Sequence, residues 1–200
     1  MEVGRPRRFD EETLLDVGQE LFWSRGYDRT SMEEIAAASG AGVSSLYAIY
    51  GSKLALFLRI FGRYCEARVE LAAEATSGVS EDLGSAVAEY LDRIVAECTS
   101  HADRRGCLML NSVVDLGDRF PEIRVVADSA TARIEDLLHD KLLRTAAARS
   151  VDLSSVEARP LAARVVLASQ GLIQLSRLRV SASHLTASAA HLSGTVGHSS

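Results

Sequence analysis

The thiol groups are the most reactive side chains of this 200-residue chain, which contains three cysteines. Cys107 has the strongest case for chemistry, because it follows Arg104 and Arg105 and would lie in the first turn of a helix. Nearby positive charge and free backbone N–H groups favour a thiolate. A cysteine also fits such a position as a small buried apolar residue, and we prefer this interpretation. Sensing of oxidants or electrophiles through Cys107 is the alternative.

A metal site is the second chemistry to consider, because Glu97, Cys98 and His101 lie close together in the sequence. No further ligands follow at a recognised spacing, whereas structural zinc sites need four. Motifs for a phosphate-binding loop, a nucleophile elbow or paired catalytic carboxylates are also missing from the sequence. We therefore predict no metal, no cofactor and no catalytic residues, and an all-helical enzyme is the weakest alternative.

The composition is that of an ordinary globular chain, with 47% hydrophobic and 24% charged residues. These values are typical of a soluble protein with a core. No stretch approaches the roughly 20 apolar residues that cross a bilayer, and the basic residues 1–8 lack the apolar segment of a signal peptide. We therefore expect a cytoplasmic protein without membrane contact, whose three thiols stay reduced.

Charge is distributed unevenly along the chain, although the net charge is −5. There is no acidic residue between Ile35 and Cys65. Three basic residues occur in that stretch: Lys53, Arg59 and Arg63. Three further arginines precede the first predicted helix, either as a DNA-binding arm or as a solvated tail: Arg5, Arg7 and Arg8. A local basic face on an acidic chain is compatible with DNA as a partner.

Two short helices joined by a glycine turn are predicted in the same region. Ser31 and Glu34 have the spacing of a capping box, in which each side chain binds the backbone N–H of the other residue. Ser39–Gly42 ends this helix, because glycine adopts the backbone angles of a tight turn. Val43–Ile49 forms the second helix. Two of its side chains are expected to face inward: Leu46 and Ile49. This pattern is typical of a helix-turn-helix, whose second helix enters the DNA major groove.

Four short runs lie in and around these helices: Gly26-Tyr27-Asp28-Arg29-Thr30-Ser31, Ile35-Ala36, Leu46-Tyr47 and Tyr50-Gly51-Ser52-Lys53. Together they resemble the DNA-binding head of the TetR family over Asp10–Phe57. Two positions depart from the family pattern. Gly42 replaces the usual serine N-cap, and Ile49 replaces a polar aromatic residue or histidine, so that one phosphate contact should be missing.

The resemblance implies a set of contacts with double-stranded operator DNA. Tyr47 and Lys53 match the tyrosine and lysine that bind phosphates in the family, and Thr30 or Ser31 would bind a phosphate from a helix N-terminus. The second helix would contact base edges through short side chains: Val43, Ser44, Ser45 and Ala48. Such residues suit thymine methyl groups and water-bridged contacts.

The rest of the chain shows helical spacing of apolar residues and no strand pattern. We therefore predict an all-α fold of about eight or nine helices. Residues 1–51 would form a three-helix DNA-binding head, and residues 52–180 an effector-binding and dimerisation body. Residues 181–200, rich in serine, alanine and histidine, are predicted to be a flexible tail.

The resemblance also implies how the body would work. It would enclose a cavity for a mostly apolar, neutral or weakly polar effector. Candidate lining residues, chosen by position, are Phe61, Tyr64, Tyr90, Ile94, Cys107, Met109, Asn111 and Phe120. The last two long helices would form the interface of a homodimer through Ile134, Leu138, Leu161, Val165, Ala168, Ser169, Gly171, Leu172 and Leu175. The predicted function is a dimeric repressor that the effector releases from a palindromic operator, with an activator as a further alternative.

Overall fold

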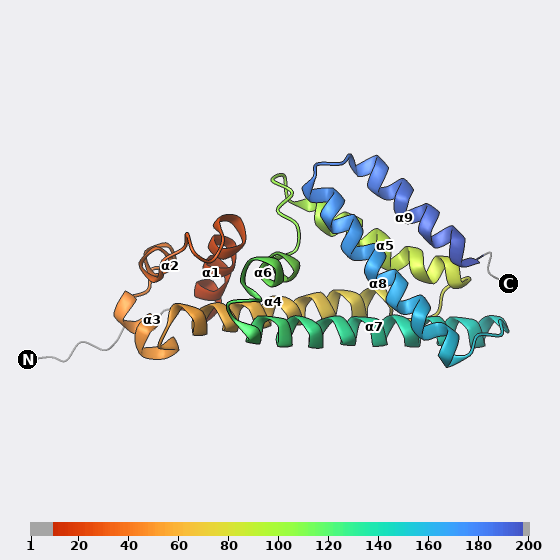
Figure 1. Cartoon of the computed structure of the whole chain (residues 1–200), viewed down its shortest axis with the longest axis horizontal. Coiled ribbons are helices and arrows are strands. Elements are labelled where there is room, and N and C mark those ends of the chain that lie inside the picture. The colour runs from red at the N-terminus through yellow and green to blue at the C-terminus, as the bar shows by residue number, and fades with distance from the viewer. Residues whose placement is uncertain (1–9, 198–200) are drawn as a thin grey trace, which may run out of the picture. The chain divides into compact units, whose positions relative to one another are not determined.

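The computed structural model describes residues 10–197, which form nine helices and no strand (Figure 1). The all-α fold predicted from the sequence is therefore confirmed. The helices are α1 (Glu11–Arg25), α2 (Met32–Ser39), α3 (Val43–Tyr50), α4 (Lys53–Ala75), α5 (Leu83–Ser100), α6 (Leu108–Leu116), α7 (Pro121–Arg149), α8 (Ser155–Arg177) and α9 (Ala182–Gly197). The chain divides into two compact units between Tyr64 and Cys65, inside α4.

The first unit contains α1, α2, α3 and the first half of α4. Local sequence signals define its helix ends. Asp10 caps α1, and Ser31 forms with Glu34 the capping box predicted for α2. Gly40 ends α2 with a φ of 71°, a left-handed conformation that glycine adopts without a steric penalty. The predicted pair of short helices with a glycine turn is therefore present.

An aromatic cluster packs α4 against the other helices of the first unit. The ring of Phe57 on α4 lies edge-on to Phe22 and Tyr27, with centroid distances of 5.0 and 5.2 Å. Phe61 stacks on Phe57 at 5.8 Å one turn further along. These contacts explain why the first unit extends beyond residue 51, the boundary expected from the sequence.

The second unit consists of the second half of α4 and of α5 to α9. In this unit α7 lies against α8, and α5 packs against α7, α8 and α9 (Figure 1). The buried side of α5 carries an apolar stripe that includes Val87, Leu91 and Ile94. The core of the second unit is therefore built around α5.

Three basic side chains of α7 hold the loop between α4 and α5. Lys141 donates to the carbonyl oxygen of Ser77 at 3.2 Å. Arg144 donates to that of Thr76 and Arg149 to that of Ser80, both at 3.0 Å. Lys141 is 1% exposed, and its Nζ also donates to Glu89 of α5 at 2.8 Å. A buried ammonium requires such partners, because desolvation of an unpaired charge is costly. The cluster therefore joins α5, α7 and the end of α4.

The C-terminal segment was predicted to be a flexible tail over residues 181–200, and its described part, up to residue 197, is corrected by the structure. Ala182–Gly197 form α9, which packs mainly on α5. Leu185, Ala189 and Val196 lie on one side of this helix and are buried, with 0%, 1% and 9% of their surface exposed. The prediction was wrong because it weighed the serine-rich composition above this helical spacing of apolar residues.

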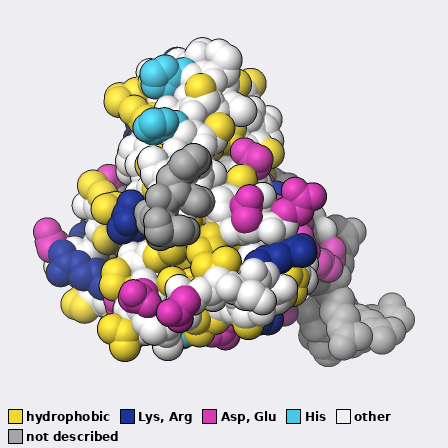
Figure 2. All heavy atoms as spheres, turned by 90° about the vertical axis from the view of Figure 1, so that its right-hand side faces the viewer, with side chains coloured by type: hydrophobic (Ala, Val, Ile, Leu, Met, Phe, Trp, Pro, Cys, Tyr) yellow, Lys and Arg dark blue, Asp and Glu magenta, His cyan; other side chains and the backbone are white. Residues whose placement is uncertain are grey.

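The helices of the described residues were compared with the requirements of a membrane span and of a metal site. Within residues 10–197 no helix is both long enough and apolar enough to cross a bilayer. No group of three or more His, Cys, Asp or Glu side chains in that range is arranged to hold a metal ion. Figure 2 shows one face on which acidic and basic side chains lie among apolar ones.

Candidate nucleic-acid interface and cavity

The outer side of α3 carries most of the predicted base-contacting residues. Of the helix residues, Leu46 is the buried one. Tyr47 is 47% exposed, Ser44 and Ala48 are exposed, and Val43 is half-buried. These residues are one turn or one position apart, so they share one face of the helix. The remaining predicted base contact, Ser45, is half-buried at the edge of that face.

The N-cap residue of α3 is the one predicted from the sequence, whereas one residue predicted to face inward does not. Gly42 is the N-cap residue, as predicted, and its carbonyl oxygen accepts from the N–H groups of Ser45 at 2.9 Å and Leu46 at 3.2 Å. Ile49 was expected to face inward, but it is 58% exposed. This expectation was wrong because Leu46 alone fills the inward side of so short a helix.

The two residues before α2, both candidates for a phosphate contact, differ in how accessible their hydroxyl groups are. Thr30 is 1% exposed. Its hydroxyl is within hydrogen-bond distance of two carbonyl oxygens, that of Gly26 at 2.9 Å and that of Leu21 at 3.3 Å. The Thr30 hydroxyl is therefore occupied inside the first unit, which leaves Ser31 as the more accessible of the two predicted residues. Ser31 is half-buried, and its hydroxyl binds Glu34 in the capping box. Thr30 forms its contacts with a preceding helix and turn, so no local signal revealed them.

Lys53, the first residue of α4, holds the turn between α1 and α2. Its Nζ donates to the carbonyl oxygens of Tyr27 at 3.0 Å and Thr30 at 3.1 Å. The same nitrogen lies 4.3 Å from the centroid of the Tyr27 ring, which is a cation–π contact. An ammonium has three N–H groups, so one remains for a phosphate. Lys53 therefore has a positioning role that the sequence did not reveal.

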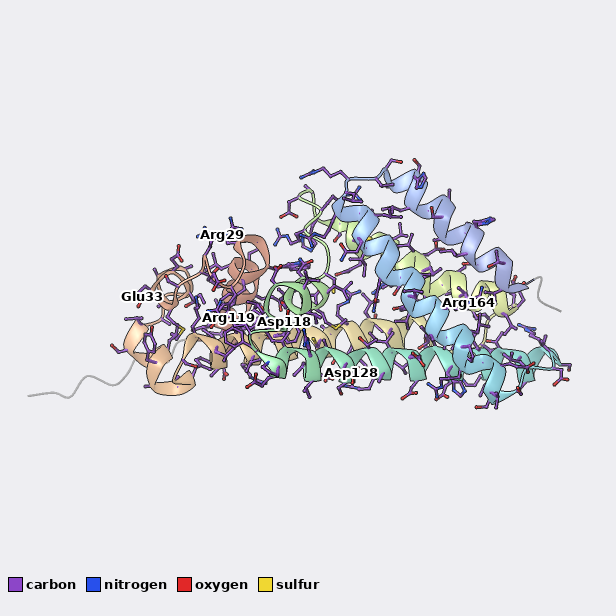
Figure 3. All side chains as sticks on the ribbon, viewed as in Figure 1. Arg29, Glu33, Asp118, Arg119, Asp128 and Arg164 are labelled. Carbon is purple, nitrogen blue, oxygen red and sulfur yellow. The ribbon has the colours of Figure 1, made fainter. Side chains whose placement is uncertain are left out.

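Other polar residues of the first unit surround α2 and α3. The hydroxyl of Tyr50 donates to Glu11 at 3.1 Å, and burial together with this carboxylate raises the pKa of Tyr50 to about 12. Arg29 precedes α2 and Glu33 lies in its first turn, and both are exposed (Figure 3). The predicted arm lies outside the described residues: Arg5, Arg7 and Arg8.

A small cavity lies in the second unit. Its volume is about 30 Å³, which is room for one or two water molecules. The lining residues come from α4 to α8 and the residue before α6: Arg68, Tyr90, Ile94, Cys107, Met109, Leu110, Thr131, Ile134, Val166, Ser169, Gln170 and Ile173. Four of the predicted effector-binding residues are among them: Tyr90, Ile94, Cys107 and Met109.

The other four predicted effector-binding residues lie elsewhere. Phe61 and Tyr64 belong to the first unit. Asn111 accepts a hydrogen bond from Arg177 at 2.8 Å, and Phe120 is the N-cap residue of α7. These four residues are therefore outside the lining of this cavity.

Among the polar residues of the cavity lining, the sequence prediction for the effector named Tyr90 and missed Arg68, Thr131, Ser169 and Gln170. Arg68 of α4 is buried and pairs with Glu97 of α5, with 3.1 Å between Nη1 and Oε1. The hydroxyl of Tyr90 lies 3.4 Å from Oγ of Ser169, and burial raises the pKa of Tyr90. A search for apolar spacing cannot find such residues, because it treats a polar side chain as facing solvent.

Comparison with known proteins decides the family. Residues 14–60 match the model of the bacterial regulatory proteins of the tetR family. Residues 84–191 match the C-terminal domain of the LmrA/YxaF-like transcriptional regulators. The chain belongs to the TetR family. It is therefore a transcriptional regulator with a helix-turn-helix, as the sequence predicted.

Individual TetR-family proteins cover much of the chain. It is 34% identical over 140 residues to the HTH-type transcriptional repressor ComR of Escherichia coli (strain K12), and the alignment spans 70% of this chain and 66% of ComR. The repressor BdcR of the same organism is 27% identical over 141 residues, with 70% of each chain covered. A cysteine mutant of the regulator CifR, solved with a 26-bp double-strand operator DNA, has a TM-score of 0.81 and 26% identity, over 95% of this chain and 98% of CifR.

Cys107 of this TetR-family chain lies in the cavity lining together with Arg68. It is 5% exposed and is the N-cap residue of α6. Arg104 instead donates to Oγ of Ser176 at 3.1 Å, and Arg105 pairs with Asp103 at 2.9 Å. Arg104 and Arg105, the two arginines expected from the sequence to favour a thiolate, therefore each contact a polar group other than Cys107, and the sensor alternative stays a prediction.

The predicted dimer-interface residues of the TetR-family body fall into two groups. Five are at most 7% exposed within the single chain: Ile134, Leu138, Val165, Ser169 and Leu172. Four retain exposed surface: Leu161, Ala168, Gly171 and Leu175. The first group packs inside the monomer, where α8 meets α5 and α7, and the second group keeps surface that a partner subunit could cover. Apolar spacing identified the buried side of each helix but not the element that buries it.

Proposed function

We propose that this chain is a dimeric transcriptional repressor that binds operator DNA and is released by a small-molecule effector. The observation that carries the DNA-binding part is α3, which follows a capped helix and a glycine turn and exposes Ser44, Tyr47 and Ala48. Repression is supported by the similarity to ComR and BdcR, which are repressors. The similarity to CifR, which was solved on its operator, supports the use of this fold on DNA.

Two kinds of DNA contact are proposed for α3 and its neighbours. Tyr47 through its phenol and Lys53 through its remaining N–H group bind phosphates, and Ser31 places the N-terminus of α2 near another. Phosphate contacts set the position of a protein on DNA but carry no sequence information. Base edges are contacted by the short side chains of α3, which are Val43, Ser44, Ser45 and Ala48.

The substitutions Tyr47→Phe and Ser44→Ala separate these two kinds of contact. Tyr47→Phe removes one hydrogen bond per subunit, so a dimer should lose about thirtyfold in DNA affinity at about 1 kcal/mol per bond. The loss should be similar for the operator and for an unrelated duplex. Ser44→Ala should instead change the ranking among operator variants. Fluorescence anisotropy with an operator selected from genomic fragments, and with a scrambled duplex, measures both effects.

Ser129→Ala is the matched control for this experiment. Ser129 is exposed on α7, in the second unit, so its hydroxyl should not affect either duplex. If both Tyr47→Phe and Ser44→Ala bind the two duplexes as the wild type does, α3 does not lie on DNA as proposed.

An exposed apolar stripe along α8 supports a homodimer. Val156 and Leu167 of α8 and its C-cap residue Leu178 are 82%, 70% and 76% exposed, and successive members are about three helical turns apart, on the same side of the helix. Gly171 lies on this stripe, and a Cβ at that position would meet no atom within 4 Å. Exposed apolar patches mark interaction surfaces. We place the second subunit on this stripe, since two recognition helices are needed for a palindromic operator.

The cavity of the second unit supports the effector. Its lining is mostly apolar with a few polar groups, as in many small-molecule sites. At about 30 Å³ it is far smaller than the roughly 300–1,000 Å³ of such sites, so binding must enlarge it. The enlargement would displace α4, which contributes Arg68 and continues into the first unit. An effector that prefers the displaced α4 then weakens DNA binding by the same factor by which DNA weakens effector binding.

A further inference from the structure

The cavity of the second unit contains a buried positive charge. Arg68 lines the cavity, and its side chain is 9% exposed. No second lysine or arginine occurs in the lining formed by the described residues. A guanidinium keeps its proton in proteins, so one wall of the cavity is always cationic. A neutral effector, as expected from the sequence, would form no ion pair with this guanidinium.

Glu97 is a partner that a ligand can replace. Its Oε1 lies 3.1 Å from Nη1 of Arg68, but its side chain is 40% exposed. The Glu97 carboxylate can therefore turn to water, whereas the buried Arg68 needs an anion beside it. The guanidinium presents five N–H donors in a planar fork that matches the two oxygens of a carboxylate. A carboxylate that enters the cavity can therefore displace Glu97.

The rest of the lining favours a ligand with one negative charge and an apolar body. Ile94, Met109 and Ile173 are apolar, and Tyr90 and Gln170 are neutral. A single cation balances a carboxylate but leaves a phosphate dianion with an uncompensated buried charge. Met109 has a flexible thioether chain that can move to enlarge the cavity.

We propose that the effector is an amphiphilic monocarboxylate, whose carboxylate binds Arg68 and whose apolar part fills the enlarged cavity. This assignment rests on the proposed effector role of the cavity, and it replaces the neutral ligand expected from the sequence. Arg68 also lies about one helical turn after Tyr64, where the first unit ends within α4. Exchange of Glu97 for a ligand carboxylate therefore acts on the helix that both units share.

Matched acids and alcohols test the charge. Sodium octanoate and sodium 4-phenylbutyrate are the acidic probes, and octan-1-ol and 4-phenylbutan-1-ol are the neutral ones. Each is titrated into the full chain by isothermal titration calorimetry. Each acid should bind about tenfold or more tightly than its alcohol, the factor of one charge-assisted hydrogen bond. Equal binding of acid and alcohol, or no binding of either acid, would overturn the proposal.

Three variants assign the effect to Arg68. Arg68→Gln should weaken binding of the acids by about tenfold or more and leave binding of the alcohols unchanged. Glu97→Gln removes the competing carboxylate, so the acids should bind about threefold more tightly. Arg133→Gln breaks an exposed ion pair with Glu66, outside the cavity lining, and should change neither. If Arg68 served only to support the fold, Glu97→Gln would not tighten acid binding.

The readouts distinguish this proposal from the proposed function. Calorimetry reports the ligand class without DNA, and operator affinity is measured separately in the presence of octanoate. Selective binding of the acids that depends on Arg68 and lowers operator affinity supports both. Selective binding that leaves operator affinity unchanged would keep the ligand class and overturn the effector role of the cavity.

Discussion

Lys53 makes two hydrogen bonds inside the protein before any DNA binds. Its donors reach the carbonyl oxygens of Tyr27 and Thr30, and the Thr30 hydroxyl binds the carbonyl oxygen of Gly26 in turn. These contacts fix the turn from which α2 starts, and α2 leads directly into α3. A lysine that resembles a simple phosphate contact therefore also sets the position of the residues proposed to read bases.

At the residue scale, Lys53→Met should destabilise the first unit. The substitution removes two hydrogen bonds from a charged donor and a cation–π contact, so the free energy of unfolding should fall by about 2 kcal/mol. Denaturation followed by the fluorescence of Trp23, the single tryptophan of the chain, reports on this unit. Arg59→Met, at an exposed position of the same helix, should change the free energy of unfolding by less than about 0.5 kcal/mol. An unchanged midpoint for Lys53→Met would show that these contacts do not hold the turn.

At the scale of elements, the loop between α4 and α5 depends on α7. The carbonyl oxygens of this loop accept hydrogen bonds from three basic residues of α7: Lys141, Arg144 and Arg149. Lys141 is the buried member of the three. These bonds fix the C-terminal end of α4, which lies in the second unit. An effector should therefore move the N-terminal part of α4 more easily than this end.

Lys141→Met tests this anchor while preserving the length of the buried side chain. Loss of the bonds to Ser77 and Glu89 should lower the free energy of unfolding by about 1–3 kcal/mol. Backbone amides of residues 76–82 should also exchange hydrogen faster. Arg133→Met, at an ion pair whose arginine side chain is 48% exposed, should cost less than about 1 kcal/mol. Equal effects of the two substitutions on stability and exchange would refute the anchor.

At the scale of the whole molecule, the proposed dimer depends on the outer side of α8. Leu167 is 70% exposed and lies near the middle of the apolar stripe. Two copies of this stripe can bury one another in a symmetric interface, because a twofold axis brings the same surface of each subunit together. Gly171 on the same side would allow the two copies of α8 to approach closely.

Leu167→Glu should convert the dimer to monomers. The substitution places a carboxylate from each subunit in an apolar interface, where burial of an unpaired charge is strongly unfavourable. Size-exclusion chromatography with light scattering should show a monomer mass at micromolar protein, and operator affinity should fall with it. Val114→Glu is the matched control, since Val114 is 77% exposed but lies on α6. A dimer that persists in Leu167→Glu would exclude this stripe as the interface.

The sequence by itself determined the all-α fold, the pair of short helices and the family. The decisive signals were local. Ser31 and Glu34 lie three residues apart, Gly42 occupies the N-cap of α3, and both relationships can be read without knowing what lies around them. Backbone hydrogen bonding within a helix depends on near neighbours, so helix ends are encoded where they occur.

Only the tertiary structure decided which side chains meet. Thr30 turns inward to a preceding helix and turn, Lys53 reaches the same turn from α4, and Arg68 meets Glu97 across two helices. Helical spacing shows that one side of a helix is buried but does not name the helix that covers it. The same limit explains α9, whose modest apolar side is stable because α5 covers it. Contacts between residues far apart in the chain depend on how helices pack, and this packing is a property of the whole fold.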